Sequence, residues 1–247
     1  MLYDAHCHLD HVDFDADRKL VFDRTRKVGV RAINAGTVLS ENKKIVSFTR
    51  GNEDWLYYVL GLSPHDASRP EIDLAEELAF VKNHLNTLVG IGEIGLDYHH
   101  YFKAKEEQDR QRTAFNAFLD LAEEHALPVV MHSRDAESDV LQAIEGRKMP
   151  KIMHCFMVPD YLERALDCGC FISVPTLKSR SAFKVIERTP LERLLCETDS
   201  PFLWHDGRNE PSHVRAVYEK ISELKKIPFE KVVRQVNENV EKVFKIT

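Results

Sequence analysis

Histidines and carboxylates stand at the ends of five short apolar segments of this sequence. His6 and His8 flank one cysteine, and residues two apart in an extended strand point to the same side. The other four segments end on single side chains, namely Glu93, His132, His154 and Asp199. Such a mixture of imidazoles and carboxylates suits two divalent cations bridged by a carboxylate. One histidine at a strand end is more often structural than metal-binding, so the prediction depends on all five segments together.

These side chains can meet only if the segments are strands of one parallel sheet. Apolar or β-branched runs begin near Leu2, Val30, Leu56, Leu88, Val129, Ile152, Phe171 and Leu194. Helical spacing of apolar residues lies between some of them, for example over 115–122 and 214–221. Strands that alternate with helices about every 30 residues predict βαβ units. Eight such units in about 250 residues are typical of an α/β TIM barrel, whose strands all end on one face.

The alternative fold is a doubly wound open sheet, but no G-x-G-x-x-G turn follows the first predicted strand. Residues 227–244 are expected to form an extra C-terminal helix, with Pro228 near its start. Because no linker or low-complexity tract divides the sequence, we expect one barrel domain over residues 1–247.

The composition excludes several classes of protein. In 247 residues, 34 Lys and Arg stand against 40 Asp and Glu, a formal charge of −6, which disfavours nucleic-acid binding over a broad basic surface. The longest run of apolar residues and glycine, 55–62, is far shorter than the about 20 residues of a membrane span. Five cysteines and no signal peptide in residues 1–5 indicate free thiols and a cytoplasmic protein.

The segments resemble the TatD-type metal-dependent deoxyribonucleases, a family of amidohydrolase-like barrels. The motifs that carry the resemblance are D-A-H-C-H-L-D (4–10), G-E-I-G-L-D (92–97), P-V-V-M-H-S-R-D (128–135), M-H-C-F (153–156), E-T-D-S-P (197–201), R-N-E-P (208–211) and N-V-E-K-V-F (239–244). They follow the order of the family along nearly the whole chain.

The resemblance implies a set of ligands and a reaction. The implied metal ligands are His6, His8, Glu93, His132, His154 and Asp199. Glu93 would bridge two divalent ions (Mg, Mn or Zn), and Asp199 would hold a metal and orient or deprotonate the attacking water. The implied activity is hydrolysis of DNA phosphodiester bonds, often from the 3′ end. We therefore expect single-stranded DNA or 3′ ends as substrate, with no membrane and no obligate protein partner.

Two departures from the family pattern concern the substrate. Members usually carry G-x-H-P after the third strand, and the resemblance implies a substrate contact at its histidine position, which Ser63 occupies here as a candidate substrate-binding residue. His65, two residues on, is the candidate to replace that histidine as substrate contact and as proton donor to the leaving group. Met157 and Val158 also replace the residues that usually follow H-C-F. Neither departure removes a predicted ligand.

Other residues just beyond the strand ends could contact a nucleic acid. Flanking phosphates could be bound by Arg134, Lys178, Arg180 and Arg208, of which Arg134 and Arg208 lie within the family motifs. Bases could stack on the candidate rim aromatics Phe14, Tyr98, Tyr101, Phe102 and Trp204.

Two other functions stay open at this point. An amide or ester hydrolase, for example a D-aminoacyl-tRNA deacylase, would share every ligand, and fold alone does not separate it from a nuclease. A non-catalytic scaffold with a structural metal fits less well, because Asp199 and all the other ligands are present.

Overall fold

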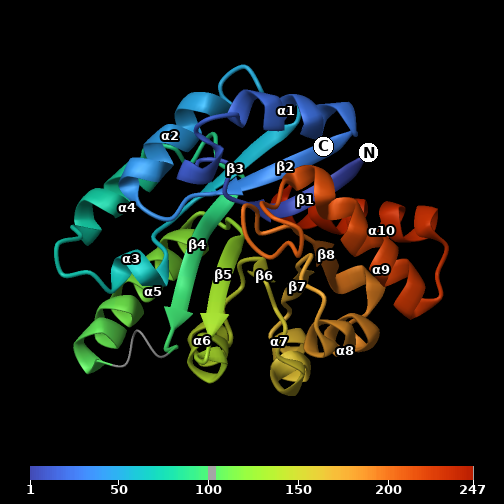
Figure 1. Ribbon diagram of the computed structural model, residues 1–247. Helices are drawn as coiled ribbons and strands as arrows, with labels where there is room; N and C mark the ends of the chain where they lie inside the picture. Colours follow the sequence, from blue (N-terminus) through green and yellow to red (C-terminus); the bar gives the residue numbers. More distant parts are fainter. Residues whose placement is uncertain (100–103, 247) are drawn as a thin grey trace.

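A computed structural model describes residues 1–99 and 104–246, and within them eight parallel strands lie side by side in sequence order (Figure 1). The strands are β1 Leu2–Cys7, β2 Val30–Ala35, β3 Leu56–Leu60, β4 Gly90–Asp97, β5 Val129–Arg134, β6 Lys151–Met153, β7 Phe171–Val174 and β8 Leu194–Cys196. The predicted alternation of strands and helices is confirmed. Only β4 and β6 begin at other residues than expected, Gly90 and Lys151.

Helices follow the strands and surround the sheet (Figure 1). They are α1 Arg18–Lys27, α2 Leu39–Thr49, α3 Pro64–Ala67, α4 Leu74–Lys82, α5 Lys105–Glu124, α6 Glu137–Ile144, α7 Leu162–Asp167, α8 Arg180–Arg188, α9 Arg215–Lys225 and α10 Phe229–Phe244. The apolar stripe predicted over 115–122 is a buried face of α5, and the one over 214–221 is formed by Val214, at the end of a 3-10 turn, and by the buried face of α9. Short 3-10 turns lie at Val12–Phe14, Pro159–Tyr161, Leu191–Arg193 and Pro211–Val214.

The seam between β8 and β1 closes the barrel. The Asp199 N–H donates to the His6 carbonyl at 3.0 Å. Asp4 on β1 is fully buried and accepts from the Thr198 N–H at 2.8 Å and from its hydroxyl at 2.6 Å. The same seam therefore places the His6–His8 segment beside Asp199.

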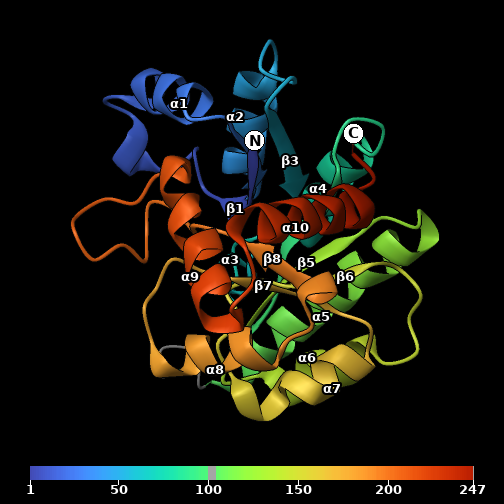
Figure 2. The same cartoon turned by 90° about the vertical axis from the view of Figure 1, so that its right-hand side faces the viewer.

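Apolar side chains fill the inside of the barrel, and α10 covers this cluster at one end. Side chains that point inward, such as Tyr3, Ile33 and Val130, form one cluster with Val243 and Phe244 of α10. Figure 2 shows α10 lying across the strands. This is the extra C-terminal helix that the sequence predicts, and it covers the amino-terminal ends of the strands. The opposite, carboxyl-terminal end stays open.

The close pairing of β4 and β5 depends on Gly95. Its φ is +148°, and a Cβ at this position would lie 2.0 Å from the carbonyl oxygen of His132. A side chain would therefore push the two strands apart. Because glycine permits the close approach, Glu93 and Asp97 on β4 lie next to His132 on β5.

Two features of the structure concern the sequence-based predictions about membrane spans and cysteines. Among the described helices, none combines the length and the apolar character needed to cross a bilayer. The five cysteines all lie within the described residues, and each is a free thiol.

Candidate metal centre

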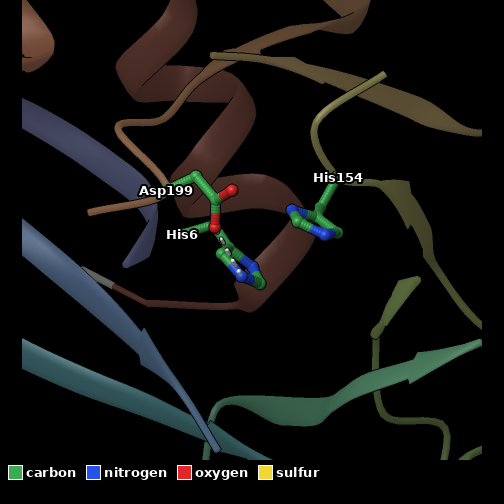
Figure 3. A group of neighbouring side chains, drawn as sticks. All are labelled: His6, His154 and Asp199. Carbon is green, nitrogen blue, oxygen red and sulfur yellow. Dashed lines mark ion pairs between the residues drawn. The ribbon is translucent and has the colours of Figure 1, made fainter. Parts of the chain in front are cut away.

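The six predicted ligands converge at the open end of the barrel. A cavity of about 950 Å³ is lined there by His8, Glu93, His132, His154 and Asp199, among others. His6 is almost fully buried, and its ring stacks on that of His154 with centroids 4.0 Å apart. Figure 3 shows Asp199 and His6 side by side, with His154 across from them. Segments far apart in the chain thus supply one cluster.

Glu93 presents its two carboxylate oxygens to two different pairs of histidines. Oε2 lies 3.4 Å from His6 Nε2 and 3.5 Å from His8 Nε2. Oε1 lies 3.1 Å from His132 Nδ1 and 3.6 Å from His154 Nε2. A carboxylate placed in this way can bridge two cations.

Two histidines have their tautomers fixed by acceptors outside the cluster. His8 Nδ1 lies 3.0 Å from the Ala35 carbonyl oxygen, which can only accept, so Nδ1 carries the proton. His132 Nε2 lies 3.0 Å from Asp97 Oδ2 and donates to that carboxylate in the same way. The remaining ring nitrogen of each neutral histidine then points its lone pair into the cluster.

The ligand atoms fit metal ions, because lone pairs of imidazole nitrogens point toward lone pairs of carboxylate oxygens. A neutral imidazole nitrogen and a carboxylate oxygen a little over 3 Å apart repel each other unless a proton or a cation lies between them. Three sets of donor atoms each lie within 4.8 Å of one another: His6, His154 and Asp199; His6, His8 and Glu93; and Glu93, His132 and His154. Nitrogen and carboxylate oxygen are the ligands that Zn²⁺ and Mn²⁺ accept.

Without a cation, protons take its place. Burial lowers the pKa of His8, but the Asp199 and Glu93 carboxylates more than offset this and raise it to about 9. His132 behaves alike: burial lowers its pKa, whereas Asp97 and Glu93 raise it to about 9. Burial raises the pKa of Glu93, yet the surrounding imidazoles hold it well below its usual range. The cluster therefore requires compensating positive charge.

Asp199 lies on the turn after β8 and faces the cavity. Its backbone is left-handed, with φ of +53°, and its N–H is held by the His6 carbonyl. One carboxylate oxygen, Oδ1, lies 3.4 Å from His8 Nε2 and 3.8 Å from His6 Nε2. This oxygen is thus beside the first histidine pair and next to the space that a substrate would enter.

Sequence reasoning did not single out two carboxylates that support the ligands. Asp97 orients His132, as described above. Glu197 is fully buried, accepts the Cys155 N–H at 2.6 Å, and places the same oxygen 3.4 Å from His154 Nδ1. Both lie inside the motifs G-E-I-G-L-D and E-T-D-S-P, which is the signal that could have identified them.

The turn after β3 brings both predicted substrate residues to the cavity. The Ser63 hydroxyl caps the short helix α3: it accepts the Asp66 N–H at 3.2 Å and donates to the Asp66 carboxylate at 2.9 Å. His65 is exposed on α3 and lines the cavity. Because the Ser63 hydroxyl is used in the helix cap, His65 is the residue of this turn that can offer a functional side chain to a substrate.

The predicted phosphate contacts divide between the cavity and the surface. Arg134 is exposed and lines the cavity, and its guanidinium forms no ion pair within the described part of the chain. Arg208 does not line it: the guanidinium forms two hydrogen bonds of 2.7 Å with Asp17 and lies over the Phe14 ring. The prediction that Arg208 contacts substrate is not supported by this geometry. Lys178, between β7 and α8, and Arg180, the first residue of α8, are exposed on the surface.

The predicted rim aromatics that the structure describes do not line the cavity. Phe14 is buried, the Tyr98 hydroxyl donates to Asp139 at 2.9 Å, and Trp204 stacks on His213 with centroids 4.3 Å apart. Tyr101 and Phe102 lie outside the described residues. The aromatic side chain that does line the cavity is Phe202, which sequence reasoning missed although it follows Asp199 by only three positions.

Replacing Asp97 by asparagine is expected to weaken metal binding by about 10- to 100-fold, the usual effect of removing a partner that orients a metal-binding histidine. A neutral amide accepts more weakly from His132 Nε2 and does not increase the basicity of Nδ1. Titration calorimetry with Mn²⁺ or Zn²⁺ measures the change. Asp135→Asn is the matched control, because Asp135 lines the same cavity but is largely exposed and contacts His99. Equal metal affinity in Asp97→Asn and wild type would contradict the orienting role.

The chain matches the family described as TatD related DNase over residues 3–245. It is 35% identical over 266 residues to the "Uncharacterized metal-dependent hydrolase YabD" of Bacillus subtilis (strain 168), with 100% of both chains covered. It is 28% identical to the "3'-5' ssDNA/RNA exonuclease TatD" of Pectobacterium carotovorum, covering 99% of this chain and 100% of that one.

A solved structure agrees with the fold. The crystal structure of YJJV, a TatD homolog from Escherichia coli, superposes with a TM-score of 0.88 at 26% sequence identity. The superposition covers 100% of this chain and 98% of the other. The barrel and its order of strands are therefore shared with that protein along the whole length.

Proposed function

Because this chain belongs to the family of TatD-related DNases, which are metal-dependent hydrolases, we propose that it hydrolyses DNA phosphodiester bonds from the 3′ end of a single strand at a two-metal centre. One observation carries the proposal: each carboxylate oxygen of Glu93 faces its own pair of histidines. A carboxylate that faces two imidazole pairs could hold two cations close together, as two-metal phosphoryl transfer requires.

The residues divide into two sets around Glu93. His6 and His8 would hold one ion together with Oε2 of Glu93 and with Asp199, and His132 and His154 would hold the other with Oε1. When bound, the ions supply Lewis acidity that neutralises phosphate charge and makes water more acidic. We propose that the ions are Mg²⁺, Mn²⁺ or Zn²⁺, because each of these accepts nitrogen and oxygen ligands, although to different degrees.

The chain's own side chains perform the proton transfers. Asp199, beside the first histidine pair, orients the attacking water and accepts its proton. His65, which lines the same cavity from the turn after β3, donates a proton to the leaving oxygen. The Arg134 guanidinium neutralises a neighbouring phosphate.

Cavity size and charge support a single strand as substrate. A volume of about 950 Å³ is within the range of pockets that take one small ligand, such as a single nucleotide. Arg134 is the one lysine or arginine among the described residues of the lining, so few phosphates can be held at once. The relative named as a 3'-5' ssDNA/RNA exonuclease supports the same direction of attack.

The test is a side-by-side substrate assay on purified protein with Mn²⁺ or Mg²⁺. A single strand labelled at its 5′ end should shorten stepwise, EDTA should stop the reaction, and excess metal should restore it. Phosphorothioate linkages at the 3′ end should block cleavage, whereas the same linkages at the 5′ end should not. If DNA stays intact while a D-aminoacyl-tRNA or a small amide is cleaved, the proposed substrate is wrong.

A further inference from the structure

The rim of the cavity is divided into an acidic part and an apolar part. Apart from the predicted ligand Glu93, carboxylates come from the end of β4 and from the segments after β1, β2, β3 and β5, namely Asp10, Glu41, Asp66, Asp97, Asp135 and Glu137. Apart from the predicted ligands His154 and Asp199 and from Cys155, the segments after β6 to β8 contribute apolar side chains, namely Met157, Val158, Leu177, Phe202 and Leu203. Because neighbouring strands are consecutive in the barrel, each set occupies a continuous arc of the rim.

Phe202 is the prominent feature of the apolar arc. Phe202 is 46% exposed, which is unusual for so large an apolar residue beside a buried polar cluster. The ring lies edge-to-face to His11, with centroids 5.2 Å apart, and 6.4 Å from the ring of His8, a predicted ligand. The ring therefore lies close to the predicted metal centre.

The turn that carries Phe202 is held firmly by hydrogen bonds. Its N–H donates to the Asp199 carbonyl at 2.9 Å, and its carbonyl accepts from the fully buried side chain of Asn209 at 2.7 Å. The same Asn209 amide also donates to the Thr198 carbonyl at 2.8 Å. Phe202 and Asp199 therefore belong to one preorganised turn, so that an apolar contact on Phe202 loses little ordering entropy.

A nucleotide matches this division of the rim. Its phosphate needs the cations of the cluster and is repelled by the acidic arc, whereas its base is flat, largely apolar on its faces and stacks on aromatic rings irrespective of sequence. The base can avoid the carboxylates only by lying over the apolar arc. Leu177, itself 37% exposed, extends the same surface beyond Phe202.

We propose that Phe202 is the stacking platform for the base of the nucleotide whose phosphate lies at the metal centre. The inference rests on the proposed function, because it takes a nucleotide as the ligand of the cavity. It adds a base subsite that selects a nucleobase by its shape and stacking rather than by hydrogen bonds.

Product binding tests the platform without requiring cleavage. In titration calorimetry of the metal-loaded protein, thymidine 5′-monophosphate should bind about tenfold more tightly than deoxyribose 5-phosphate, the size of effect expected for one stacked base. Phe202→Ala should remove this difference, Phe202→Trp should keep it and Phe202→Leu should keep part of it. Leu20→Ala is the matched control, because Leu20 is 57% exposed on α1 and does not line the cavity.

A kinetic comparison tests the same subsite in the reaction. With a normal single strand, Phe202→Ala should raise KM about tenfold and leave kcat nearly unchanged. With a strand whose 3′-terminal nucleotide lacks its base, wild type and Phe202→Ala should have the same KM. A general disturbance of the turn would instead impair both substrates equally and would overturn the proposal.

The two assays separate the platform from the function. Wild-type protein that degrades DNA, with Phe202→Ala binding both products as wild type does, would refute the platform and leave the nuclease standing. Wild-type protein inert on DNA, but with a base preference that Phe202→Ala removes, would refute the nuclease and retain the platform.

Discussion

Glu93→Gln is expected to abolish DNA hydrolysis, with a fall in kcat/KM of roughly 10⁴-fold, and to reduce the amount of metal bound per chain. Each oxygen of Glu93 serves a different histidine pair, so the substitution weakens both ion sites at once. An amide also offers an NH₂ group to one pair, and that group cannot bind a cation.

The measurement is steady-state hydrolysis of a labelled single strand together with metal analysis of the purified variant. Glu41→Gln is the matched control, because Glu41 lines the same cavity and is hydrogen-bonded to the Thr37 hydroxyl rather than to a predicted ligand. Unfolding should be followed in parallel, so that a misfolded variant is recognised. Full metal content with undiminished hydrolysis in Glu93→Gln would show that Glu93 does not bridge the ions.

The strands and the ligands could be predicted from the sequence because both are local signals. A buried parallel strand is a short apolar run that ends at a turn, and six of the eight strands begin at the predicted residue. Each predicted ligand follows the apolar part of such a run, although β1, β4 and β5 continue beyond His6, Glu93 and His132. Once the strands are parallel and neighbouring, convergence of those side chains follows from the fold.

What the sequence could not supply are contacts made by long-range pairing. Arg208 comes after a strand end like a substrate residue, but its partner Asp17 is 191 positions away. The contact of Asp97 with His132 depends on the register of β4 against β5, which Gly95 permits. Which aromatic faces the cavity is likewise decided by packing: Trp204 turns onto His213, whereas Phe202 stays exposed.

From the charge of the cavity we expect metal to bind before the substrate. The formal charge of the chain is −6. Among the described residues that line the cavity, several carboxylates stand against one guanidinium, that of Arg134. The metal-free cavity should therefore repel a phosphodiester, and only the protons on the histidines reduce this repulsion. Bound cations reverse the sign only at the cluster, so that attraction should be confined to the phosphate located there.

Asp199→Asn is expected to lower kcat by about 10²- to 10⁴-fold, the range for loss of a general base, while KM for the strand changes little. Asparagine preserves the shape of the side chain and one oxygen for the ion, but it cannot accept a proton. In contrast to Glu93→Gln, this variant should still bind metal at His132 and His154, because Glu93 remains beside both of these histidines and Asp199 lies nearest to His8 and His6. The comparison therefore separates proton transfer from metal retention.

Three measurements decide between these roles for Asp199: metal content, kcat and KM on the same labelled strand. Asp135→Asn again serves as control, since it removes a carboxylate from the same cavity at a largely exposed position. Loss of one ion together with activity, restored by high Mn²⁺, would make Asp199 a ligand without a role in proton transfer. Retention of both ions with normal kcat would remove Asp199 from the reaction altogether. Retained metal with kcat reduced at every metal concentration is the result that the position of Oδ1 beside His8 predicts, because the carboxylate is then needed for the chemical step itself.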